Sequence, residues 1–159
     1  MPKRTLETRL QQCLTGETLH NSLNFVAYLK ETGMTTTTET SGYFTYMGEL
    51  ICIIIEFEVS DEHPEGMWII CDCQATQHDV LPLDEKLKEF LHANVSICTG
   101  ECGCKDWPRG GDKIIFGQEF KSVCSSEIKY INPSSGELEK VKMLMELWKH
   151  AIADKAHSQ

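Results

Sequence analysis

The sequence predicts a single α+β domain, residues 1–159, in which an antiparallel sheet packs against N-terminal and C-terminal helices. Apolar residues recur at the helical period near both ends of the chain, which indicates amphipathic helices. Between them, segments of alternating polarity are separated by turn-forming residues, which indicates an antiparallel meander of three or more strands. A length of 159 residues suits one domain that buries a core without needing a metal or a disulfide.

Two helices are predicted near the N-terminus, over residues 5–14 and 17–32. A Thr-Gly pair separates them, and Gly33 supplies the residue of positive φ that often ends a helix. The threonine run that follows favours extended chain, so residues 35–38 are predicted to be a loop or an edge strand. The two apolar stripes consist of Leu6, Leu10, Cys13 and Leu14, and of Leu19, Leu23, Val26 and Leu29.

Three strands are predicted next, over residues 43–47, 49–59 and 67–73, with turns at Gly48 and at residues 60–66. The second strand alternates strictly, so one of its faces should enter the core and the other should be more polar. The set expected in the core is Ile51, Ile53, Ile55, Phe57 and Val59, and the other set is Cys52, Ile54, Glu56 and Glu58. In the third strand, Cys71 and Cys73 share the face of Ile69 and are expected to be half-buried core thiols.

The second half of the chain should contain a helix over residues 82–92 and short strands over residues 113–116 and 127–131. Residues 118–124 fit either a helix or a strand. Ser134 and Glu137 match the capping box that starts a final helix. We expect this helix to support the core, with Trp148 buried, because its polar face mixes both charges and so does not suit a membrane. Its apolar stripe consists of Leu138, Val141, Leu144, Met145, Trp148 and Ile152.

The charge of the chain is −9, and no Lys or Arg occurs between Glu31 and Glu85. Such an acidic surface repels a phosphate backbone, so nucleic-acid binding is not expected. We interpret the acidic stretch as a solvated sheet face. The alternative is a ligand- or protein-binding module in which Glu56 and Glu58 meet a cationic group. The sequence leaves the small-molecule or protein partner and the oligomeric state open.

The start of the chain lacks the apolar run of a signal peptide. The longest strongly apolar run, residues 50–55, is far shorter than the ~20 residues that span a bilayer. We therefore expect a cytoplasmic protein that makes no membrane contact. Its eight cysteines are then thiols or metal ligands, although the even count also permits the disulfides of a secreted protein.

A cysteine-rich loop is the strongest chemical signal in the sequence. Cys98, Cys102 and Cys104 lie within seven residues, with glycines that let the loop fold several thiolates toward one centre. Zinc commonly takes four Cys or His ligands in tetrahedral geometry, and Cys124 is the best candidate for the fourth. The sequence therefore predicts a metal-binding domain with a structural zinc site formed by Cys98, Cys102, Cys104 and Cys124.

Other chemistries remain open for the same cysteines. An iron–sulfur cluster or Cu(I) would also accept thiolate ligands. A thiol-based redox enzyme or sensor would need a lowered pKa, for which Lys105 and Arg109 are the nearby positive charges. Three inert thiols are the remaining interpretation. Whether the protein is an enzyme is left open, and no catalytic residue is selected by the sequence.

The run from Cys98 to the final helix resembles a group of small bacterial α+β proteins of unknown function. The likeness rests on this run, including the segments Gly117-Gln118-Glu119-Phe120 and Tyr130-Ile131-Asn132-Pro133. It covers about a third of the chain. The resemblance implies an α+β fold and carries over no activity, because a shared fold does not by itself establish a function.

Overall fold

Local capping explains where the helices begin in the computed structural model, which describes residues 4–98 and 111–158. Thr5 caps α1 (Leu6–Cys13) by accepting one backbone N–H group, and Asp84 caps α3 (Glu85–Ala93) by accepting two. The predicted capping box is present at the start of α4 (Ser135–His157). The remaining helical elements of the described chain are α2 (Gly16–Glu31) and a short 3-10 helix, η1 (Ala75–His78).

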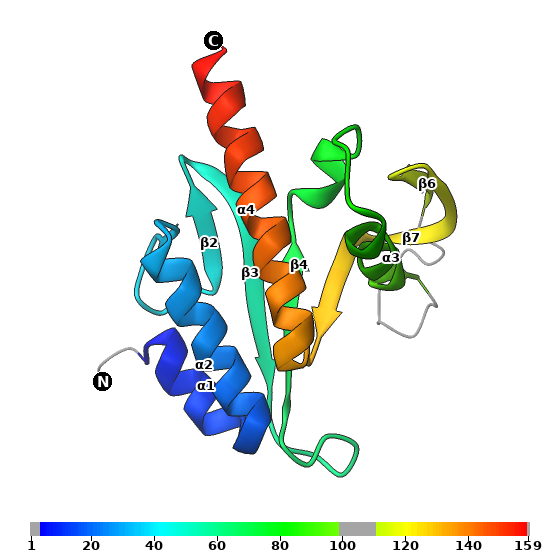
Figure 1. Ribbon diagram of the computed structural model, residues 1–159. Coiled ribbons are helices and arrows are strands. Elements are labelled where there is room, and N and C mark those ends of the chain that lie inside the picture. The colour runs from blue at the N-terminus through cyan, green and yellow to red at the C-terminus, as the bar shows by residue number, and fades with distance from the viewer. Residues whose placement is uncertain (1–3, 99–110, 159) are drawn as a thin grey trace.

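The strands of the described chain form one antiparallel sheet of seven strands, in the order β1-β2-β3-β4-β7-β5, with β6 paired to β7. Helices α2 and α4 lie side by side across the same face of this sheet, and α3 lies next to α4 (Figure 1). The predicted α+β fold, with helices from both ends of the chain on an antiparallel sheet, is therefore confirmed. The strands are β1 (Thr35–Thr36), β2 (Tyr43–Tyr46), β3 (Glu49–Phe57), β4 (Met67–Asp72), β5 (Val95–Ile97), β6 (Gly111–Ile115) and β7 (Gln118–Ile131).

Strand β7 joins two segments that the sequence treats separately. The ambiguous residues 118–124 and the predicted strand at 127–131 form one strand of 14 residues. A tight hairpin folds β7 back on β6, with Phe116 and Gly117 at φ 46° and 84°, as a two-residue hairpin of this kind requires. Ser122 and Glu127 also have positive φ, and register shifts accompany them where β7 pairs with β5 and β6. These bends let β7 pair with β4 at one end and with β5 and β6 at the other.

The alternation predicted for β3 is present, but the face assignment is largely wrong. Cys52 and Ile54 are buried beneath the helices, whereas Ile55 and Phe57 are 38% and 45% exposed. Only Ile51, at the start of the strand, is fully buried as predicted. The covered face continues on β4, where Ile70 and Trp68 pair with Ile54 and Glu56. A period of two separates two faces, but it does not say which of them the helices will cover.

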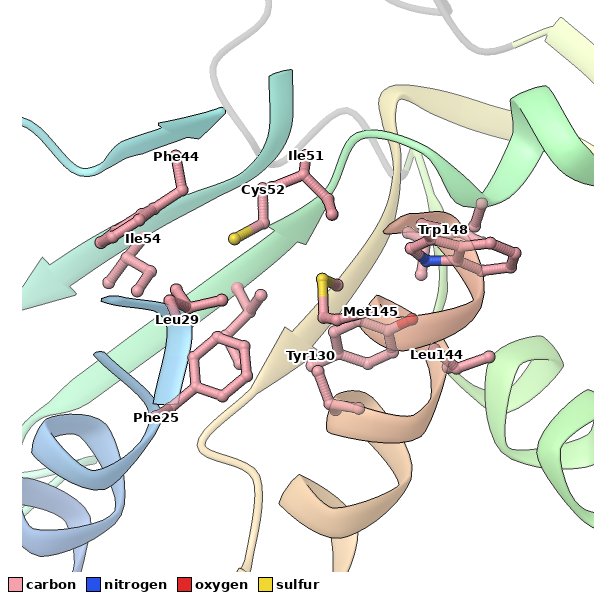
Figure 2. Packing of buried hydrophobic residues seen from close by; sticks show 14 of the residues in the cluster. Phe25, Leu29, Phe44, Ile51, Cys52, Ile54, Tyr130, Leu144, Met145 and Trp148 are labelled. Atoms are coloured by element: carbon pink, nitrogen blue, oxygen red, sulfur yellow. The ribbon is translucent and has the colours of Figure 1, made fainter. Parts of the chain in front are cut away.

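The core lies between this covered face and the helices. Figure 2 shows Phe25 and Leu29 of α2, and Met145 and Trp148 of α4, gathered against the inner face of the sheet. The whole predicted stripe of α4 is buried, and Trp148 has no exposed surface. The expectation that the final helix supports the core is therefore confirmed.

Candidate functional site

The uncovered face of the sheet carries a row of side chains that the strand register brings together. Tyr43 of β2 pairs with Ile53 of β3, which in turn pairs with Cys71 of β4. Ile55 continues the floor one row further along. Because paired residues of antiparallel strands point to the same side, these side chains share one surface. They line a cavity of about 800 Å³.

Polar groups surround this apolar floor. Arg9 of α1 stands on one side, where its Nε lies 2.7 Å from Oε1 of Glu56 and its Nη1 donates to the backbone carbonyl of Thr40. On β7, Oε1 of Glu127 accepts a hydrogen bond of 2.6 Å from Nζ of Lys113. The full lining consists of Arg9, Thr40, Ser41, Gly42, Tyr43, Ile53, Ile54, Ile55, Glu56, Cys71, Asp72, Cys73, Thr76, Gln77 and Glu127.

The two thiols of the cavity are poor nucleophiles. Burial raises the pKa of the Cys71 thiol; the nearby charge of Lys129 opposes this shift, and Asp72 adds a smaller contribution in the same direction as burial. Burial and the negative charge of Asp72, with a smaller contribution from the neighbouring Cys71 thiol, raise the pKa of Cys73 to about 12. Because the thiolate is the reactive form, both groups are protonated and unreactive at neutral pH. The cavity therefore offers these sulfur atoms as soft, weakly polar surface.

Asp72 links the sheet to α4 through a buried network of hydrogen bonds. Its Oδ1 accepts the backbone N–H groups of Gln74 and Ala75, at 3.0 and 2.9 Å. Its Oδ2 accepts the hydroxyl of Tyr130 at 2.8 Å and the indole N–H of Trp148 at 3.0 Å. Burial raises the pKa of Asp72, and the four donors oppose this shift because they favour the carboxylate. All four donors bind the same carboxylate, so Asp72 has a structural role: it holds the sheet, η1 and α4 together, and it is not free to act as an acid or base. We call this set of hydrogen bonds the Asp72 network.

His78 of η1 contacts the Asp72 network through Trp148. Its ring stacks on Trp148 with the ring centroids 5.6 Å apart, and its Nε2 lies 2.8 Å from Oε1 of Gln74. Burial lowers the pKa of His78, so the imidazole is held mainly neutral at neutral pH. The stacking therefore ties η1 to α4 without adding a charge to the core.

The structure places two of the four predicted zinc ligands. Cys98 is buried directly after β5, and its backbone N–H donates to the carbonyl of Ser122 at 2.7 Å. Cys124 is half-buried on the neighbouring strand β7. Cys102 and Cys104 lie outside the described residues. Among residues 4–98 and 111–158, no cluster of three or more His, Cys, Asp or Glu side chains is placed to hold a metal ion.

The chain was compared with protein-family models, curated proteins and solved structures. None of the three comparisons gave a match. Within the described part of the chain, no helix combines the length and the apolar character needed to cross a membrane. The function is therefore inferred from the geometry of the chain itself.

Neither the cavity nor the Asp72 network was predicted from the sequence. The floor of the cavity uses Ile53 and Ile55, which the alternation assigned to the core. One signal for the network was present, because Asp72 is in phase with Trp68 and Ile70, the face of the third strand opposite the half-buried cysteines. A carboxylate in phase with large apolar residues is expected to need several buried donors.

Proposed function

We propose that the chain is a binding module that holds a small organic ligand on the uncovered face of its sheet. The observation that carries the proposal is the cavity of about 800 Å³, with its floor of isoleucine, tyrosine and cysteine side chains and its polar rim. Ligand sites are typically concave, mostly apolar, and bounded by a few polar groups that orient the ligand, with volumes of ~300–1,000 Å³.

Three features favour binding over catalysis. The thiols in the cavity are protonated at neutral pH, so neither suits nucleophilic attack. Glu56 and Glu127 each already pair with a basic side chain. The buried carboxylate of Asp72 is occupied by four donors. The groups on the rim are therefore suited to orienting a ligand.

A neutral fluorescent probe tests this proposal. N-phenyl-naphthylamine gains fluorescence in apolar surroundings, and we expect a saturable gain when it is titrated with the protein. Ile55→Glu places a charge on the cavity floor and should abolish the gain. The matched control is Ile114→Glu, because Ile114 is 67% exposed on β6 and lies outside the cavity lining. Equal fluorescence from both variants and the wild type would refute the cavity as the binding site.

A structural zinc site is the second candidate function, and one observation favours it. Cys98 directly follows β5, and Cys124 lies on β7, the strand that pairs with β5; because the pairing is antiparallel, the two cysteines lie on opposite sides of the Ile97–Val123 pair. Two predicted ligands far apart in sequence thus lie on or directly after paired strands. We propose that Cys102 and Cys104 complete a tetrahedral site of four thiolates with them. The site would act in the cytoplasm, where thiols stay reduced.

Elemental analysis of protein purified without added metal checks the zinc proposal. We expect about one equivalent of zinc per chain, as a four-ligand structural site predicts. Cys124→Ser should lose the metal, whereas Cys13→Ser should keep it, because Cys13 lies on α1 and is not among the predicted ligands. Iron in place of zinc would favour an iron–sulfur cluster. Metal-free protein whose thiols label rapidly would favour the redox alternative, and slow labelling without metal would favour inert thiols.

A further inference from the structure

We infer that the ligand of the cavity is an amphiphilic amine, with an apolar body on the sheet and a protonated nitrogen directed to Glu127. This inference rests on the proposed binding function and specifies the chemical class of the ligand. It follows from the charged residues of the cavity lining. One oxygen of Glu127 lacks a hydrogen-bond partner among the described residues, whereas Glu56 and Asp72 are bound by other residues of the protein.

One basic residue and three acidic residues line the cavity. The carboxylate of Asp72 belongs to the other side of the sheet, where its four donors occupy it. Arg9 and Glu56 neutralise each other across 2.7 Å. Glu127 is the remaining charged residue of the lining, and its partner Lys113, like Lys129 beside Cys71, lies outside the lining.

Glu127 keeps capacity for a further donor. Its Oε1 accepts from Lys113, whereas its Oε2 is a buried oxygen with no hydrogen-bond partner in the structure as described. An ionised carboxylate has about four acceptor positions, and leaving a buried one empty is unfavourable. The side chain is 22% exposed, and the side chain of Lys113 is 40% exposed and outside the cavity lining. Because Oε2 itself is buried, an ammonium group in the cavity would reach this carboxylate at its exposed part, with the carboxylate rotating to present Oε2.

The floor determines the other half of the ligand. Ile53, Ile55 and Tyr43 present branched and aromatic surface, and Tyr43 keeps 55% of its own surface exposed. An aromatic or branched apolar group of the ligand that packs on this floor removes its own surface and that of the floor from water, which favours binding. The chain charge of −9 also attracts cations and repels anionic ligands of the same shape.

Three naphthalene compounds of matched shape test the inference by isothermal titration calorimetry: naphthylethylamine, naphthylethanol and naphthylacetate. We expect the ammonium compound to bind about tenfold more tightly than the alcohol, the effect of one charge-assisted hydrogen bond, and the acetate to bind most weakly. Glu127→Gln should reduce the preference for the amine to about one and leave the affinity of the alcohol unchanged. Alcohol binding thereby also shows that the variant is folded.

Lys113→Met supplies a test of opposite sign, because it removes the cation that competes for Glu127. The amine should bind this variant at least as tightly as the wild type. Equal affinity for all three compounds, or tighter binding of the acetate, would overturn the inference and leave the binding function standing. Failure of all three to bind would overturn both.

Discussion

Asp72→Ala is expected to lower the free energy of unfolding by roughly 3–5 kcal/mol, because it removes the acceptor of a fully buried network. The substitution leaves the hydroxyl of Tyr130 and the indole N–H of Trp148 without their partner inside the core. It also removes the side chain that accepts the first backbone N–H groups of the turn into η1. Urea denaturation monitored by tryptophan fluorescence measures the change.

Two further variants separate the network from ordinary packing. Tyr130→Phe deletes one donor and keeps the ring that stacks on Phe90, so it should cost less than Asp72→Ala. Asp79→Ala removes an exposed carboxylate close in sequence and should change stability by less than about 0.5 kcal/mol. A loss at Asp72 no larger than that at Asp79 would contradict the role assigned to the buried carboxylate.

Trp148→Ala is expected to cost roughly 3–5 kcal/mol of unfolding free energy, because it opens a large cavity between α4 and the sheet. The indole is fully buried and stacks on both His78 and Phe116. Phe116 lies in a tight turn with φ 46°, so its packing against Trp148 also helps to hold the β6–β7 hairpin. Thermal and urea denaturation should both report the loss.

The control for this variant lies on the same helix. Met143 is 54% exposed on α4, and Met143→Ala should change stability by less than about 0.5 kcal/mol. Asp72 and Trp148 share a hydrogen bond, so the double variant should lose less than the sum of the two single losses. Unchanged stability of Trp148→Ala, or strict additivity with Asp72→Ala, would show that the helix is not braced through this contact.

The sequence by itself determined most of the local elements, although it left residues 118–124 undecided and predicted neither β5 nor η1. Helical spacing identified α4 and its buried stripe, and the Ser134–Glu137 capping box marked where it begins. Alternation identified β3, and turn-forming residues marked the turns on either side of it and the start of β4. These features depend on neighbours within a few residues, so they can be predicted from the order of residues along the chain.

For the candidate sites, the sequence predicted the cysteine ligands of the proposed zinc site but not the cavity. The cysteine cluster selected Cys98, with Cys124 as the best candidate for a fourth ligand; Cys98 directly follows β5, and Cys124 lies on β7, the strand paired with β5. The zinc site itself stays a prediction, because Cys102 and Cys104 lie outside the described residues. The cavity could not be predicted, because it combines side chains from α1, β2, β3, β4, η1 and β7.

Only the tertiary structure decided which face of the sheet the helices cover. Ile54 and Ile55 are adjacent and chemically identical and both contribute to the cavity lining, yet Ile54 is buried and Ile55 is 38% exposed. Their difference arises from helices more than twenty residues away in sequence, which pack on one face of the sheet and leave the other open. Asp72 is buried for the same reason, because its donors Tyr130 and Trp148 come from distant elements. Periodicity separates the two faces of a strand, whereas long-range packing selects the one that becomes the core.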